Sequence, residues 1–388
     1  MNRKHVCITV SIVLLLVLSC ASGLGFLAVR GIQRSLAGPA PIQYEVPNEL
    51  ASVAMPEMAD SLAWSADGAY VVAGGFSDVV CVDVAKVAVV ATFKATGGVQ
   101  ALAFSPDGKW LAVANGRFKD AGAAPPELIL YDVPAFAEKF RAKTNLGNGF
   151  IDIAWAADSK SLCAIDDPEG PRNQKAVVRR WVLPAFTEQP AIRAPQVGNY
   201  KSLAMSPDGR TLAVGDEPGQ VAPRWVRLFD LTSGAERSSF QANTPLDRLG
   251  FTANGSAVGV FDTQHLSWWD AATGKPADPG PVRVANQPAG VSGERAHHPV
   301  SPDGSTSAVG TAEYPKFIGQ GLGEPKNKYG AFVHVIDNLT AKTWTWRVGD
   351  AGGVTDTPAL AFSPDGTKLA GTVKQPSGGS IVIWSVPK

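Results

Sequence analysis

Short apolar runs alternate with polar turns along most of the chain, from about residue 59 to the C-terminal end. The recurring turn is best preserved as Ala-Phe-Ser-Pro-Asp-Gly, at 103–108 and again at 361–366. Weaker copies begin at Ala63, Ala154, Ala204, Gly250 and Pro299. Proline presets φ in such a turn, aspartate tolerates the next position, and glycine takes the left-handed conformation that closes it. Each copy therefore predicts a β-hairpin whose two strands are the flanking apolar runs.

A third apolar run follows each hairpin, as at 128–133, and a poorer fourth run follows in places, as at 87–93. The units recur at a spacing of 40 to 62 residues, measured between the turn residues Asp67, Asp107, Asp158, Asp208, Asn254, Asp303 and Asp365. Repetition at this period with four strands per unit predicts an all-β fold, a seven-bladed β-propeller of four-stranded blades. Unrelated hairpins in a β-sandwich would not keep one register seven times.

The residue that opens each turn copy is small in six of the seven copies, with Pro299 as the exception. Blades converge on the axis of a propeller, so the innermost strand has least room at that position. The next residue is aromatic in five copies, namely Trp64, Phe104, Trp155, Phe251 and Phe362. Each ring can bury roughly 150–250 Å². We expect these rings to pack between adjacent blades.

The last unit lacks a fourth strand, because only Pro387 and Lys388 follow its third run at 381–386. Upstream of the first unit, the segment 42–46 has no partner within that unit. We predict that 42–46 joins the last blade as its outer strand, which closes the ring and covers an open sheet edge. The propeller then spans residues 42–388.

The N-terminal residues have a different character. After the flank 1–5, residues 6–29 contain no charged side chain, and Arg30 and Arg34 follow. As a helix, this segment is about 36 Å long, enough to cross a bilayer. We interpret 6–29 as a transmembrane signal anchor and 30–41 as a linker, since the apolar residues continue past Cys20. A lipoprotein acylated at Cys20 and a signal cleaved after Ala21 are the alternatives.

The charge pattern bears on location and on partners. Arg3, Lys4 and the α-amino group slightly favour a cytoplasmic N-terminus, which puts the propeller on the extracytoplasmic side of a single-pass protein. Lys plus Arg and Asp plus Glu both number 35, and the body of the chain has no basic block. Nucleic acid is therefore not an expected partner. Cys81 and Cys163 fall in separate blades and are expected to be small core residues.

The ends of the third strands carry a family resemblance. They read Trp269-Asp270, Phe229-Asp230, Tyr131-Asp132, Ile336-Asp337 and Val82-Asp83. With the Ser-Pro-Asp-Gly hairpins, this pattern resembles WD-repeat propellers, of a bacterial and membrane-anchored type, over about residues 42–388. The resemblance implies a seven-bladed platform that binds other proteins. Only Trp269-Asp270 is a literal Trp-Asp pair, and the Gly-His pair of many WD repeats is missing.

Sequence motifs for catalysis are absent. No His-Glu-x-x-His, zinc-spaced cysteine pair or Gly-x-Ser-x-Gly occurs, so no cofactor, metal or catalytic residue is predicted. Some seven-bladed propellers are lactonases or related hydrolases with a metal at the axial channel. Candidate carboxylates for such a site are Asp152, Asp247, Glu294 and Asp356. They do not share one register relative to the turns.

The loops between second and third strands are long in blades two, three, four and six, and all of them emerge on one face of a propeller. Long loops on a rigid scaffold commonly carry binding residues. The candidate partner-binding residues in them are Arg117, Lys119, Asp120, Asp166, Asp167, Arg172, Asp216, Arg224, Tyr314, Lys316 and Phe317. Solvated insertions without function are the alternative, since loop length costs little stability.

These patterns favour one function over two others. The favoured hypothesis is a membrane-anchored, monomeric propeller scaffold that binds protein partners through the long-loop face. The alternatives are a propeller-type hydrolase or lactonase with an axial metal, and a cell-wall or polysaccharide-binding module. The last would show exposed aromatic pairs on one face.

Overall fold

The computed structural model describes residues 46–95, 97–116, 125–168, 176–193, 200–216, 223–242, 246, 248–252, 254–261, 266–277, 284–285, 301, 305–313, 330–337, 340, 342–349, 359–375 and 378–387. The chain divides into two units, Met1–Tyr44 and Glu45–Lys388, and every described residue belongs to the second. The predicted flank 1–5, anchor 6–29 and linker 30–41 lie outside the described residues.

Four consecutive stretches of chain each form a four-stranded antiparallel sheet. Blade one contains β2 (Ala59–Trp64), β3 (Tyr70–Gly75), β4 (Asp78–Asp83) and β5 (Ala88–Lys94). Blade two contains β6 (Val99–Phe104), β7 (Trp110–Asn115), β8 (Glu127–Asp132) and β9 (Glu138–Lys143). Blade three contains β10 (Gly147–Trp155), β11 (Ser161–Pro168), β12 (Val177–Val182) and β13 (Thr187–Arg193). Blade four contains β14 (Tyr200–Met205), β15 (Thr211–Asp216), β16 (Arg224–Asp230) and β17 (Glu236–Ala242).

Three further sheets complete the set. Blade five contains β18 (Arg248–Thr252), β19 (Ala257–Phe261), β20 (Leu266–Asp270), β21 (Pro276–Ala277) and the added β22 (Val284–Ala285). The described part of blade six contains β23 (Thr306–Glu313), β24 (Gly330–Asp337) and β25 (Thr343–Gly349). Blade seven contains β26 (Leu360–Phe362), β27 (Lys368–Gln375), β28 (Gly378–Ser385) and the N-terminal β1 (Glu49–Met55).

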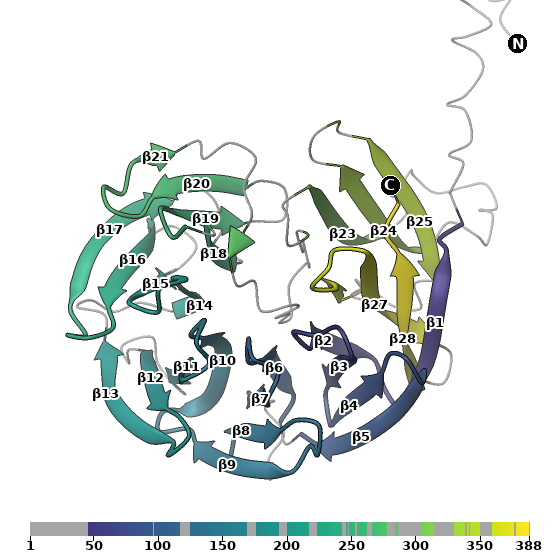
Figure 1. Cartoon of the computed structure of the whole chain (residues 1–388), viewed down its shortest axis with the longest axis horizontal. Helices are drawn as coiled ribbons and strands as arrows, with labels where there is room; N and C mark the ends of the chain where they lie inside the picture. The colour runs from purple at the N-terminus through teal and green to yellow at the C-terminus, as the bar shows by residue number, and fades with distance from the viewer. Residues whose placement is uncertain are drawn as a thin grey trace, which may run out of the picture. The chain divides into compact units, whose positions relative to one another are not determined.

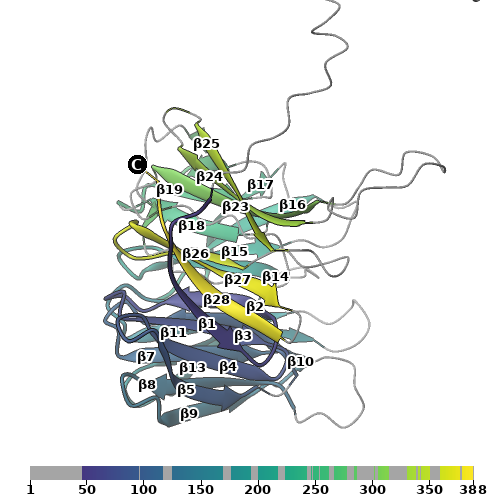
Figure 2. The same cartoon turned by 90° about the vertical axis from the view of Figure 1, so that its right-hand side faces the viewer.

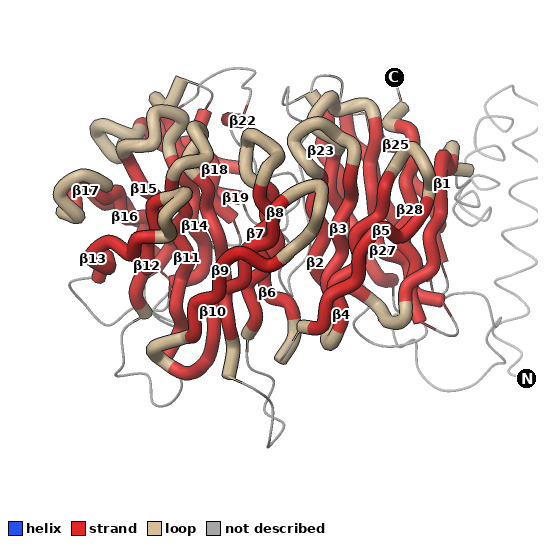
Figure 3. The backbone as a smooth tube through the Cα atoms, turned by 60° about the horizontal axis from the view of Figure 1, so that its bottom comes forward, coloured by secondary structure: helices blue, strands red, loops and turns tan. Residues whose placement is uncertain are grey.

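The sheets stand as blades around a common axis, with β2, β6, β10 and β14 innermost and β5, β9, β13 and β17 on the rim (Figure 1). Figure 3 shows the strands running between two faces of this unit. We call the face with the hairpin turns between first and second strands the turn face, and the opposite one the loop face. The all-β prediction is confirmed, and five of the seven described sheets have the predicted four strands. The predicted transmembrane helix falls outside the described residues.

The recurring turn is held by its own side chains. In blade one, Ser65 Oγ donates to Asp67 Oδ1 over 2.6 Å, and the N–H groups of Ala69 and Tyr70 donate to Asp67 Oδ1 and Ser65 Oγ. Gly68 closes the turn at φ +71°. The same Ser–Asp bond recurs in blades two, four and seven, and Thr252 with Asn254 replaces it in blade five. The side chains at the Asp and Asn positions of these turns therefore hold the hairpins together.

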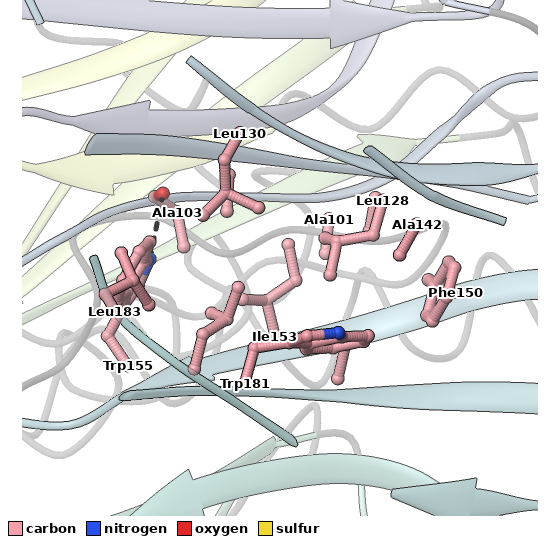
Figure 4. Close-up of a cluster of buried hydrophobic side chains, with 14 residues drawn as sticks. Ala101, Ala103, Leu128, Leu130, Ala142, Phe150, Ile153, Trp155, Trp181 and Leu183 are labelled. Atoms are coloured by element: carbon pink, nitrogen blue, oxygen red, sulfur yellow. Dashed lines mark hydrogen bonds between the residues drawn. The ribbon is translucent and has the colours of Figure 1, made fainter. Parts of the chain in front are cut away.

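Buried apolar clusters join neighbouring blades. Six clusters link blades one and two, two and three, three and four, four and five, six and seven, and seven and one. Figure 4 shows the cluster between blades two and three, where Leu128 and Leu130 of β8 meet Ile153, Trp155 and Trp181. Cys81 and Cys163 are buried free thiols in two of these clusters, as predicted.

Two of the aromatic residues that follow the small first residue of a turn copy also hydrogen-bond across the interfaces between neighbouring blades, which we call seams. Trp155 Nε1 of blade three donates to the carbonyl oxygen of Ala103 in blade two over 3.2 Å, drawn as the dashed line in Figure 4. Trp64 Nε1 of blade one donates to the carbonyl of Ala361 in blade seven over 3.0 Å. Both acceptors are the small residues that open the turn copy of the preceding blade. Small residues there let the ring reach the neighbouring backbone.

Aromatic rings also fill the outer parts of two seams. Phe136 and Phe186 occupy the same position in the turns between third and fourth strands, with φ values of +52°. Phe186 stacks on Phe140 of blade two at 4.9 Å between ring centroids. Phe136 meets Tyr70 of blade one edge-on at 5.3 Å. A phenylalanine rarely adopts positive φ, so the ring packing offsets this backbone strain.

The N-terminal strand of the described chain closes the ring. β1 pairs antiparallel with β28, with Val53 opposite Ile381, and Figure 2 shows the two strands side by side. The closing strand is therefore Glu49–Met55 and not 42–46. Residues 42–45 lie outside the described part of the chain, and Val46 belongs to no strand and is 93% exposed. The alternating apolar residues Ala51, Val53 and Met55 face the seam with blade one, which explains the later register.

The seam hydrogen bond of Trp155 can be tested without removing its ring. Trp155→Phe should lower the free energy of unfolding by about 1–2 kcal/mol, because the carbonyl of Ala103 loses its donor inside the seam. Trp155→Ala should cost about 3–5 kcal/mol, because the ring is lost as well. Equilibrium unfolding in urea measures both. Equal stabilities of Trp155→Phe and the parent chain would contradict the proposed role of the bond.

Candidate functional site

Buried carboxylate–arginine clusters lie beneath the loop face in blades three and four. Asp166, at the loop end of β11, is fully buried and lies 3.5 Å from Arg179 Nη1. Arg179 Nε in turn donates to Glu188 Oε1 of the outer strand over 2.7 Å. The guanidinium also lies 5.0 Å from the ring centroid of Trp181. The cluster thus links second, third and fourth strands of one blade.

Blade four repeats this arrangement at the equivalent positions. Asp216, at the end of β15, accepts a hydrogen bond from Arg227 Nε over 3.2 Å. Arg227 Nη1 donates to both carboxylate oxygens of Glu236 on the outer strand. Asp216 is 2% exposed and Arg227 is 8% exposed. Two neighbouring blades therefore share an Asp–Arg–Glu cluster where their long loops begin.

Blades one and two use other residues at the same end. In blade one, Lys94 Nζ donates to Asp78 over 2.7 Å, and Glu57 accepts the N–H groups of Ser77 and Asp78. In blade two, Arg141 pairs with both Glu127 and Glu138. The loop ends of four consecutive blades are thus fixed by ionic contacts. This makes the loop face a rigid base from which loops project.

The clusters also connect loops to neighbouring blades. Thr144 Oγ1 and the N–H of Asn145, in the segment between β9 and β10, donate to Asp166. Arg179 Nη1 donates to the carbonyl oxygen of Lys143 at the end of β9 over 2.6 Å. Burial raises the pKa of Asp166, and the bonds from Thr144 and Asn145 offset part of that effect. One buried carboxylate therefore positions the connection from blade two to blade three.

A second buried polar contact lies near the axis. Asp152 of β10 accepts two backbone hydrogen bonds. One comes from the N–H of Leu203 in blade four over 2.6 Å, and the other from the N–H of the next residue, Ile153, over 2.8 Å. Ser202 accepts the N–H of Leu249 in blade five over 3.0 Å. Burial raises the pKa of Asp152 to about 6, although the two N–H groups and the charge of Arg248 oppose it. This chain of contacts joins the inner strands of blades three, four and five.

Four of the predicted partner-binding residues fall in the described part of the chain. Asp166 and Asp216 are buried: Asp166 accepts the N–H of Asn145 in the connection between blades two and three, and Asp216 accepts Arg227 Nε of its own blade. Asp166 lies two residues before the last residue of β11, and Asp216 is the last residue of β15, where each carboxylate still points into the blade. Asp167 is half-buried and accepts a bond from Asn148 Nδ2 over 2.5 Å. Arg224 is half-buried at the start of β16.

The remaining predicted residues stay predictions, because they lie outside the described residues. They are Arg117, Lys119, Asp120, Arg172, Tyr314, Lys316 and Phe317.

Sequence reasoning missed the arginines at the centre of the clusters. Arg179 and Arg227 each interrupt the apolar run of a third strand, two residues before an aromatic residue. A buried arginine requires a partner, and Glu188 and Glu236 stand on the next strand in each blade. The sequence signal for such a cluster is an arginine inside an apolar third strand, with a glutamate near the start of the fourth strand.

The structure bears on the metal hypothesis through one of its four carboxylates. Both oxygens of Asp152 accept backbone N–H groups, and Asp247, Glu294 and Asp356 lie outside the described residues. Within the described ranges, no three His, Cys, Asp or Glu side chains are grouped to hold a metal. In the same ranges, no helix is long and apolar enough to cross a bilayer.

Comparisons with known proteins agree with the geometry. A family model described as "WD domain, G-beta repeat" matches residues 88–119. These residues run from β5 of blade one through β7 of blade two, so the matched unit spans the seam between two blades. No curated protein matches the chain.

Among solved structures, the crystal structure of the β-propeller domain of Myceliophteria thermophila Cps50 (Swd1) is similar. Its TM-score is 0.57 at 14% identity, over 88% of this chain and 100% of that one. At this identity the likeness shows the fold alone. The fold is a β-propeller, and the WD-repeat match covers residues 88–119.

The Arg179 cluster yields a stability prediction. Arg179→Leu should lower the free energy of unfolding by about 3–5 kcal/mol, because Asp166 is left as a buried carboxylate without its cation. The double variant Arg179→Leu/Asp166→Leu should recover part of that loss. Arg193→Leu, at an exposed arginine of the same blade, is the control and should change stability little. A double variant less stable than Arg179→Leu would contradict the assignment.

Asp152 predicts a pH dependence. Its folded-state pKa of about 6 lies above the unfolded value of 3.8, so between these pH values the folded chain holds a proton that the unfolded chain has lost. The stability of the parent chain relative to Asp152→Asn should therefore fall by about 2–3 kcal/mol as pH rises from about 3.5 to 7. Urea unfolding across this range measures it, with the exposed Asp158→Asn as control. A difference that does not change with pH would contradict the prediction.

Proposed function

We propose that this protein is a membrane-anchored propeller that holds partner proteins on its loop face. The observation that carries the proposal is the set of ionic contacts that fixes the loop ends of blades one to four, above all the buried Asp–Arg–Glu clusters of blades three and four. Clusters of this kind make a rigid base for long connections. The WD-repeat match at 88–119 and the propeller fold support a scaffold role.

The proposal includes location. Residues 6–29 are the anchor in a single-pass arrangement, with the monomeric propeller on the extracytoplasmic side. An acylated Cys20 or a cleaved signal would give a lipoprotein or a secreted protein instead. The partner is a protein, and neither a cofactor nor a nucleic acid takes part in the binding.

The described surface offers little to a polysaccharide-binding role. Among the described residues, the exposed large apolar side chains include one aromatic ring, Phe76, which is 49% exposed. Sugar-binding faces usually stack their ligand on several aromatic rings, as the sequence-based alternative required. The scaffold role is therefore preferred.

Charge reversal on the two faces tests the proposal. Arg117→Glu/Lys119→Glu, in the loop of blade two, should lower capture of the native partner from detergent-solubilised source membranes by about tenfold or more, since such a loss needs only about 1.4 kcal/mol. Lys109→Glu/Lys160→Glu places the same charge change on the turn face, at exposed lysines, and should leave capture unchanged. Quantitative mass spectrometry of the captured proteins gives the readout. Loss of capture by the turn-face pair alone would contradict the proposal.

A further inference from the structure

Exposed apolar side chains gather on one sector of the rim. Among the described residues, the large apolar side chains at least 40% exposed are Val46, Leu50, Phe76, Val87, Val89, Val90 and Val182. Val89 and Val90 lie at the start of β5, the outer strand of blade one, and Val87 immediately precedes it. Leu50 lies at the start of β1, the outer strand of blade seven, and Val46 lies three residues before that strand. We call these five residues the blade-one rim.

The two strands are neighbours on the rim, as Figure 1 shows. Ala51 and Val53 of β1 pack in one cluster with Val84, which precedes β5. Both strands begin at the turn face: the N–H of Val84 donates to Ala69 in the turn of blade one, and the N–H of Val386, just after β28, donates to Thr367 in the turn of blade seven. The N–H of Ser385 donates to the carbonyl of Asn48, immediately before β1. The exposed residues therefore share one corner of the propeller.

Two other outer strands carry charges near their starts, where β5 has valines. β9 includes Glu138, Lys139 and Arg141, and β17 includes Glu236 and Arg237. From Ala88 to Phe93, β5 has neither a charge nor a proline. Outer strands that face water are usually protected by such residues.

Lysines flank the valines on both sides. Lys86 bonds to Asp83 and Lys94 to Asp78, with side chains 72% and 80% exposed. Apolar residues flanked by long cationic side chains are typical of surfaces that meet the headgroup region of a bilayer.

We propose that the blade-one rim lies against the lipid bilayer. This inference rests on the proposed anchor. Val46 is the first described residue of the propeller, and only residues 30–45 separate Val46 from the apolar segment 6–29. Sixteen residues reach at most about 55 Å, so the anchor keeps this corner near the membrane. A tether makes the contact intramolecular, and a small apolar area then suffices to hold it. The loop face, with its candidate partner-binding loops, stays clear of the lipid.

Depth-dependent quenching in proteoliposomes tests this orientation. The full chain carrying Val90→Cys is labelled with the fluorophore NBD and reconstituted into phosphatidylcholine–phosphatidylglycerol vesicles with or without nitroxide-labelled phospholipid. Val182→Cys is the matched control, a valine 40% exposed on blade three at the turn face. The parent chain treated identically gives the background from native thiols, of which Cys81 and Cys163 are buried.

The expected result is at least about threefold stronger quenching at position 90 than at position 182, with a blue-shifted emission at position 90. Equal quenching at the two positions would overturn the proposal. A blue shift at position 90 that depends on protein density and is unaffected by nitroxide-labelled lipid would also overturn the proposal, because a second copy of the chain would then cover the strand. An alkaline wash separates the two hypotheses. Chain lost from the vesicles would refute the anchor and the rim contact together, whereas retained chain without quenching would refute the rim contact alone.

Discussion

Packing at the seams between blades stabilises this propeller, because each sheet can bury its two faces only against the sheets of the adjacent blades. Small residues at the axis let the Trp64 and Trp155 rings reach the backbone of the preceding blade. The phenylalanines of the outer turns fill the wider part of two seams. The same constraint explains the closing strand, since blade seven is complete only when the N-terminal β1 pairs with β28.

A closed ring of this kind fixes its strand ends, and the ionic clusters use that rigidity. In blades three and four, an aspartate at the end of the second strand is held by an arginine of the third and a glutamate of the fourth. Such clusters contribute little net stability over apolar packing. Their role is to fix the point at which each long loop leaves the sheet. The loop face can thus vary in its loops while its base stays constant.

The turns of the six blades whose turn aspartate or asparagine is described, the strand order and the aromatic seam residues could be predicted from the sequence, because each follows from a local rule applied at a recurring spacing. The sequence predicts that an N-terminal strand closes the ring, but it does not identify the residues that form this strand. Segment 42–46 and β1 both alternate apolar and polar residues, and only the seam with blade one selects Ala51, Val53 and Met55. Asp166 and Asp216 looked like loop residues in the sequence, because their partners, Arg179 and Arg227, come from strands that follow the loops. Contacts of this range depend on the sheet register, which a single sequence does not give.

The central claim is that partners bind the loop face, and hydrogen–deuterium exchange of the full chain, alone and with its captured partner, tests it most directly. The account predicts slower exchange in the complex at the loop ends of β7, β11, β15 and β16 and in the connections between them. Exchange at the turns 105–108 and 206–209, on the opposite face, should be the same in both states. Protection confined to those turns or to the rim strands would contradict the account.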